Sequence, residues 1–149
     1  MAVDLLDINV WLALVDENHQ HHASARDYWQ QYKADRVAFC RVSMLGLLRL
    51  STQTRVLSRA LNHDEAWDIY RRYMALPTVQ FLAEPANLEQ HFAALTLTAD
   101  LPHRMWTDSY LAAIALASKS RLVSFDGDFK RFAGLDFLHH KHMPSASAD

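Results

Sequence analysis

The sequence predicts an α/β fold, a single sandwich domain in which helices cover both faces of a central parallel sheet of four to five strands. The first observation is that apolar runs of strand length alternate with longer segments of helical periodicity. The second is that the strand-like runs are almost continuously apolar, as in a sheet buried on both faces. The third is size: 149 residues, 50% hydrophobic and 21% charged, suit one globular domain with a sizeable core.

Each expected strand is a short apolar run. Helical segments separate these runs, which is the order that parallel strands require. The last of the five is the weakest. In chain order they are VDLLD (3–7), RVAFCRV (36–42), TVQFL (78–82), RLVSFD (121–126) and LDFLHH (135–140).

Six segments have the apolar spacing of helices. Ser43 and Thr107 are the expected N-caps of the third and the sixth. The fourth begins with capping and acidic residues and ends before Pro77, as a helix should. The six segments are 9–16, 21–34, 43–53, 62–76, 87–99 and 107–120.

Composition excludes several classes of protein. The single cysteine, Cys40, rules out an internal disulfide framework and a Cys-rich zinc site, and it suits a reducing cytosol. No apolar run reaches the roughly 20 residues that span a bilayer, and no basic segment precedes the N-terminal apolar run, so neither a membrane span nor a secretory signal is expected. Three glycines cannot form the loops that cradle nucleotide phosphates. The domain is expected to cover 1–142, followed by a disordered tail over 143–149.

Four aspartates fall where the predicted sheet would bring them together. Asp7 ends the first strand, Asp126 ends the fourth, and Asp108 opens the helix that leads into the fourth. Asp128 follows two residues after Asp126. Each one alone could be a helix cap or a turn residue. Sites in parallel sheets, however, form at the carboxyl ends of the strands, and several carboxylates gathered there would repel one another unless a cation lay between them.

The chemistry of these side chains points to a particular kind of cation. Oxygen ligands without an organised set of Cys or His favour Mg²⁺ or Mn²⁺. Such a cation lowers the pKa of a bound water and neutralises charge on a phosphoryl transition state. Metal-dependent hydrolysis of a phosphodiester bond follows as a hypothesis.

Five stretches carry a resemblance to a known family: LLDINVWLAL, VSMLGLLRL, TDSYLAAIALA, LVSFDGDF and RFAGLDF. In this order, which covers nearly the whole chain, they resemble the PIN domain, in particular the VapC-type ribonuclease toxins of bacterial toxin–antitoxin pairs. The resemblance implies an endoribonuclease of α/β/α fold that cleaves RNA with Mg²⁺ or Mn²⁺. It also implies a homodimer in the bacterial cytoplasm that is held inactive by a cognate antitoxin.

The resemblance also assigns roles to individual residues. Asn9 and Ser124 match positions where the family keeps a small polar residue that orients the acids. Arg49 matches a position that is usually Arg, as an RNA or structural anchor, and Arg104 is close enough to Asp108 in sequence to reach an RNA phosphate. The resemblance implies that three acids are catalytic metal ligands, namely Asp7, Asp108 and Asp126. It implies a supporting role for a fourth acid, Asp128.

One position departs from the family pattern. The family commonly has a Glu where this chain has Met44, and a thioether does not replace a carboxylate on Mg²⁺. Two interpretations follow. Either the remaining acids suffice, with water in place of the missing ligand, or the chain is a weakened or inactive module that binds antitoxin or RNA.

Two further expectations concern residues outside the acid cluster. Asp4, three residues before Asp7, should point to the opposite face of the strand and lie near solvent. The helix carrying Trp67 and Tyr73 resembles one that contacts the antitoxin or the second subunit. The tryptophans are expected in the core or an interface rather than as platforms for base stacking: Trp11, Trp29, Trp67 and Trp106.

Overall fold

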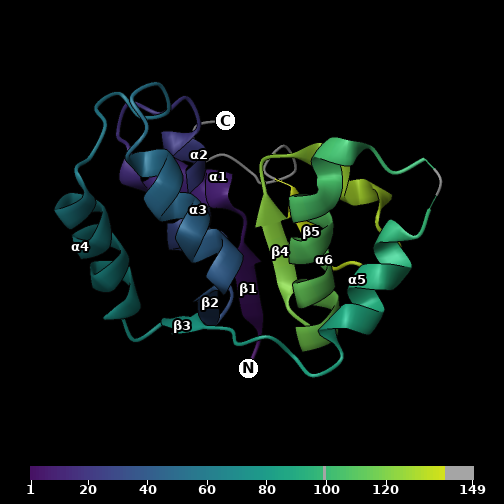
Figure 1. Ribbon diagram of the computed structural model, residues 1–149. Helices are drawn as coiled ribbons and strands as arrows, with labels where there is room; N and C mark the ends of the chain where they lie inside the picture. The colour runs from purple at the N-terminus through teal and green to yellow at the C-terminus, as the bar shows by residue number, and fades with distance from the viewer. Residues whose placement is uncertain (99, 140–149) are drawn as a thin grey trace, which may run out of the picture.

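The computed structural model describes residues 1–98 and 100–139, and its centre is a five-stranded sheet in the order β3-β2-β1-β4-β5. Every neighbouring pair is parallel, so the predicted α/β class with a parallel sheet is confirmed (Figure 1). The predicted domain end at 142 and the tail 143–149 lie outside the described residues. The strands are β1 (Val3–Leu6), β2 (Arg36–Phe39), β3 (Val79–Phe81), β4 (Arg121–Ser124) and β5 (Phe137–His139).

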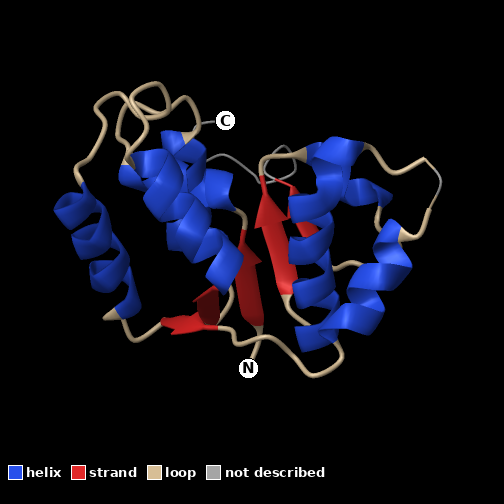
Figure 2. Ribbon diagram, in the orientation of Figure 1, coloured by secondary structure: helices blue, strands red, loops and turns tan. Residues whose placement is uncertain are grey.

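Helices flank the sheet in two groups, one on either side of β1 and β4 in the view of Figure 2. The first four lie in one group, and the last two, which contact each other extensively, lie in the other. A π-helical turn (Tyr28–Tyr32) follows the second helix, and 3₁₀ turns cover His103–Met105 and Gly127–Arg131. The helices are α1 (Ile8–Val15), α2 (His22–Asp27), α3 (Arg41–Ser51), α4 (His63–Met74), α5 (Leu88–Thr96) and α6 (Trp106–Ser118).

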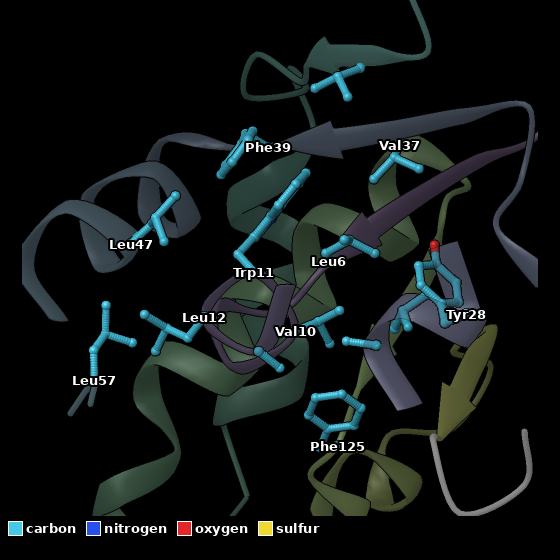
Figure 3. Packing of buried hydrophobic residues seen from close by; sticks show 14 residues of the cluster. Leu6, Val10, Trp11, Leu12, Tyr28, Val37, Phe39, Leu47, Leu57 and Phe125 are labelled. Atoms are coloured by element: carbon cyan, nitrogen blue, oxygen red, sulfur yellow. The ribbon is translucent and has the colours of Figure 1, made fainter. Parts of the chain in front are cut away.

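Each face of the sheet has its own hydrophobic core, because alternate residues of a strand point to opposite faces. Leu6 belongs to the core under α1 to α4, where Trp11 stacks on Phe39 with ring centroids 3.8 Å apart (Figure 3). Leu5 belongs to the other core, under α5 and α6. There α6 buries five consecutive residues, Leu111 to Ala115, so its small apolar side chains lie close against the sheet. No helix of the described residues is long and apolar enough to cross a bilayer.

Two predicted helix caps are wrong, because the preceding segments end elsewhere than expected. Strand β2 stops at Phe39, so Cys40 is the N-cap of α3 and Ser43 lies inside the first turn. The Ser43 hydroxyl instead accepts a hydrogen bond from the Cys40 backbone N–H at 2.9 Å. Helix α6 begins at Trp106, directly after the 3₁₀ turn, which places Thr107 within the helix.

Asp4 is fully buried, so the expectation that it lies near solvent is wrong. Strand register pairs Asp4 with Arg121 of β4, whose Nε and Nη2 donate to the two carboxylate oxygens at 2.8 and 2.9 Å. The hydroxyl of Tyr28 donates to the same carboxylate, and burial together with this neighbouring charge raises the pKa of Tyr28. Asp4 is therefore a buried structural charge with its own counter-charge.

Candidate active site

Strands β1 and β4 are neighbours at the centre of the sheet, and each is followed by an aspartate at its carboxyl end. Asp7 follows β1, and its backbone N–H donates to the carbonyl of Val123 in β4 at 2.9 Å. Asp126 comes two residues after β4, and Asp108 lies in the first turn of α6. The tips of β1 and β4 point toward the same end of the molecule, where α6 begins (Figure 1). Three segments far apart in the sequence thus deliver acids to one edge of the sheet.

Asp7 is buried, with 7% of its surface exposed, and both of its carboxylate oxygens accept hydrogen bonds. One accepts from the backbone N–H of Ile8 at 2.7 Å, which makes Asp7 the N-cap of α1. The other accepts from the hydroxyl of Ser124 at 2.7 Å. Burial raises the pKa of Asp7 above its ordinary value, the two hydrogen bonds oppose the rise, and the nearby charge of Asp126 adds to it. Asp7 is therefore both a cap and a carboxylate held in one orientation.

Ser124 and Asn9 connect Asp7 to the segment that carries Asp126. The Ser124 hydroxyl oxygen accepts from the backbone N–H of Asp126 at 2.9 Å and from Asn9 Nδ2 at 3.3 Å. The Asn9 side-chain oxygen accepts from the backbone N–H of Phe125 at 3.4 Å. These contacts link α1, which carries Asn9, to the end of β4, which carries Ser124.

The pKa of Asp108 is raised to about 7. Burial is the largest cause, followed by the charges of Asp7, Asp126 and Asp128, while Arg104 opposes them. A carboxyl with such a pKa is about half protonated at neutral pH, because its ionised form is repelled by its neighbours. The four predicted acids consequently form one electrostatic group.

Asp126, Asp128 and Arg104 form the outer side of this group. Asp126 caps the 3₁₀ turn after β4 by accepting from the backbone N–H of Asp128 at 2.9 Å. Arg104 Nη1 lies 3.0 Å from Asp128 Oδ2, and both side chains are largely exposed, at 66% and 47%. An exposed ion pair of this kind contributes little to stability. Arg104 is therefore held beside the acids by one exposed ion pair.

Two other positions singled out in the sequence, Arg49 and Met44, both lie on α3. Arg49 is on the exposed face of α3, where it lines a shallow groove together with Trp67 of α4. It is not among the charges that act on Asp108. Met44 packs against the core under α1 to α4, and its sulfur accepts from Arg41 Nη1 at 3.1 Å.

The fit of a metal ion follows from the chemistry of the cluster. Within residues 1–98 and 100–139, no group of three or more His, Cys, Asp or Glu side chains is positioned to hold a metal ion as the side chains stand. The cluster is instead an open set of carboxylates, in which burial and the charges of Asp7, Asp126 and Asp128 raise the pKa of Asp108. Mg²⁺ and Mn²⁺ suit such a set, because they bind through a few carboxylates and keep water in their remaining positions.

Sequence reasoning missed the exposure of one residue beside this cluster. Trp106, expected in the core or an interface, is 51% exposed at the start of α6, two residues before Asp108. The signal for this in the sequence was the position of Trp106, two residues before the predicted site acid Asp108.

Comparisons with known proteins agree with this geometry. The family model described as PIN domain matches residues 5–135. Ribonuclease VapC41 of Mycobacterium tuberculosis is 35% identical over 138 residues, which cover 89% of this chain and 94% of the relative. Two solved structures share the fold. VapC20 of Mycobacterium tuberculosis, described as a sarcin-ricin loop cleaving toxin, has a TM-score of 0.68 at 17% identity and covers 89% of this chain and 97% of its own. VapBC2 of Rickettsia felis, bound to a DNA fragment from its promoter, has a TM-score of 0.69 at 12% identity, with 92% and 98% covered.

Proposed function

The chain belongs to the PIN-domain family, and we propose that it is a divalent-metal-dependent endoribonuclease, the toxin of a bacterial toxin–antitoxin pair that works in the cytoplasm. One observation carries the proposal: acids from three separate segments meet at one edge of the sheet, where burial and then the charges of the neighbouring acids raise the pKa of Asp108 to about 7. Such a cluster is costly for folding, and a site that binds a cation and a phosphodiester accounts for its presence.

In this proposal each residue of the site has a distinct part. Asp7, Asp108 and Asp126 would hold the cation, assisted by Asp128. A bound Mg²⁺ or Mn²⁺ supplies positive charge that stabilises the phosphoryl transition state and makes water more acidic. Ser124 keeps the carboxylate of Asp7 in one orientation through its 2.7 Å hydrogen bond.

The side chains around the acids would bind the substrate. Arg104 exchanges its contact with Asp128 for an RNA phosphate, which suits a guanidinium on an exposed side chain. Asn9 acts through Ser124 rather than on the substrate, because its amide contacts that hydroxyl. Arg49, which lies away from the acids, would contact RNA farther from the cleaved bond.

Met44 supports a second candidate function. Since Met44 supplies no carboxylate, the chain could be a weakened PIN module that acts by binding antitoxin or RNA. We favour retained activity, because Mg²⁺ accepts water in place of a protein ligand.

The partner in this proposal is an antitoxin whose apolar helix binds a groove beside α4. The groove measures about 330 Å³, and apart from Arg72 its lining is apolar or aromatic: Leu14 and Val15 of α1, Ile69 and Tyr73 of α4, and Leu76 just after α4. An amphipathic helix fits a surface of this kind. VapBC2 of Rickettsia felis is a toxin–antitoxin complex of the same fold. A homodimer is also proposed, and sedimentation of the purified chain tests it.

The deciding experiment measures cleavage of total bacterial RNA by the purified chain, free of antitoxin, with Mg²⁺, with Mn²⁺ and with EDTA. We expect cleavage with either metal, none with EDTA, and a loss of at least ~100-fold in Asp7→Asn and Asp108→Asn. Asp68→Asn on the exposed face of α4 is the matched control and should cleave like the wild type. Equal, undetectable cleavage by wild type and variants would refute the nuclease and leave the binding module.

A further inference from the structure

Trp106 is an exposed aromatic residue within the helical turn that carries Asp108. It is 51% exposed, is the first residue of α6 and follows Arg104 by two residues. Its indole contacts Phe92 of α5 edge to face, with centroids 5.8 Å apart and an interplanar angle of 69°. A contact of this geometry covers at most one face of the indole, so the exposed part of the side chain includes an aromatic face.

The other tryptophans present no comparable surface. Trp11 and Trp29 contact each other edge to face within the core under α1 to α4. Trp67 is 40% exposed, but the guanidinium of Arg71 lies over its ring, 5.1 Å from the centroid. Trp106 therefore combines exposure, an aromatic side chain and a position in the same helical turn as Asp108.

We propose that Trp106 stacks on a base of the RNA next to the bond that is cleaved, an inference that rests on the proposed ribonuclease function. Every base has a π-face, so an indole binds nucleotides without reading their sequence. Arg104, which is exposed, pairs with Asp128 and precedes Trp106 by two residues, supplies a charge for the phosphate of the same segment. An aromatic face beside an exposed guanidinium is the combination that binds single-stranded nucleic acid.

Helix geometry defines which nucleotide the indole contacts. Trp106 and Asp108 differ by about 3 Å along the helix axis and by about 200° around it. The two side chains therefore leave the first turn of α6 on different sides. The stacked base must belong to a nucleotide that neighbours the cleaved bond, and this base must be unpaired so that its face is available.

The test compares Trp106→Ala, Trp106→Phe and the control Leu97→Ala, at an exposed apolar residue after α5, with the wild type. The probe is a short fluorescein-labelled single-stranded RNA of mixed sequence, with its binding followed by anisotropy in EDTA so that no cleavage occurs. A second probe is an abasic ribose–phosphate chain of the same length. We expect Trp106→Ala to bind the RNA roughly 5- to 100-fold more weakly, and the abasic chain as the wild type does. Trp106→Phe should retain most of the affinity, and Leu97→Ala all of it.

Each other outcome has a definite meaning. Equal affinity of Trp106→Ala and wild type for the RNA, an equal loss on both probes, or no RNA binding by the wild type overturns the proposal. A changed oligomeric state of Trp106→Ala with unchanged RNA binding overturns it too, because Trp106 would then be an interface residue. If Trp106→Ala selectively loses RNA binding but the wild type cleaves no RNA, the proposed ribonuclease function is refuted and the proposed stacking is supported. In a chain that cleaves, Trp106→Ala should raise KM and leave kcat nearly unchanged.

Discussion

Replacing Asp108 by Asn should stabilise the metal-free protein while abolishing cleavage. Burial and three neighbouring acids raise the pKa of Asp108 from 3.8 to about 7 in the folded chain. This carboxyl is harder to ionise in the folded chain than in the unfolded one. At a pH where it is ionised in both states, the difference in pKa lowers the free energy of unfolding by about 4 kcal/mol. Because Asp108 is partly exposed and solvent screens its neighbours, we expect about 2 kcal/mol. Asn has nearly the same shape and carries no charge.

The sign of the pH dependence follows from the same values. The folded state binds the Asp108 proton more tightly than the unfolded state, so wild-type stability falls as pH rises from about 4 to 7. The advantage of Asp108→Asn should therefore be full at pH 8, less than half as large at pH 5, and absent below the unfolded pKa. Saturating Mg²⁺ should reverse it, because the ion stabilises the wild type and binds the variant less tightly.

The assay is urea unfolding of both proteins at pH 5 and pH 8, with EDTA and with Mg²⁺. Asp68→Asn is the control, because that exposed acid pairs with Arg72 and its loss should cost less than ~0.5 kcal/mol at either pH. Wild type at least as stable as Asp108→Asn in EDTA at pH 8 would refute the reasoning. So would a gain of the same size at both pH values, since that gain would not come from ionisation.

Three further predictions concern other residues. Ser124→Ala removes the hydrogen bond that lowers the pKa of Asp7, so the acidic limb of the cleavage pH profile should shift to higher pH; an unchanged limb would contradict the role of this hydroxyl. Met44→Glu should tighten Mg²⁺ binding measured by calorimetry and lower the stability of the metal-free protein, whereas unchanged affinity would show that this position does not reach the ion. Arg121→Met leaves the charge of Asp4 buried without its cation and should cost about 3 kcal/mol in urea unfolding, with a Km for RNA like that of wild type in the folded fraction.

The acids could be predicted from the sequence because strand ends are visible in the pattern. Asp7 and Asp126 follow apolar runs, and the rule for parallel sheets places such residues at one edge. The end of β2 was harder, since Cys40 and Val42 continue the apolar pattern around Arg41, so the predicted cap fell on Ser43. Exposure of Trp106 depends on how α6 packs against α5, which local sequence does not specify.

The contacts of Asp4 show a second reason why part of the structure could not be predicted from the sequence. Its partner, Arg121, lies 117 residues away, and only the register between β1 and β4 brings the two together. Arg121 appears in the sequence as one more charge at the start of a strand. A pairing that depends on strand register is not visible without the sheet.

Asp4 lies in β1 and Asp7 directly after it, and the difference between the groups that contact them supports the proposed cation site. Asp4 is buried, and the chain supplies its counter-charge through Arg121, with a further hydrogen bond from Tyr28. Asp7 is also buried, yet the described groups that act on its pKa are two hydrogen-bond donors and another acid, with no cation among them. The chain therefore neutralises the buried carboxylate of Asp4 with its own Arg121, whereas no cation among the described residues acts in the same way on Asp7. For Asp7 the counter-charge is left to come from solution, which is the condition that the proposed site for an exchangeable metal ion requires.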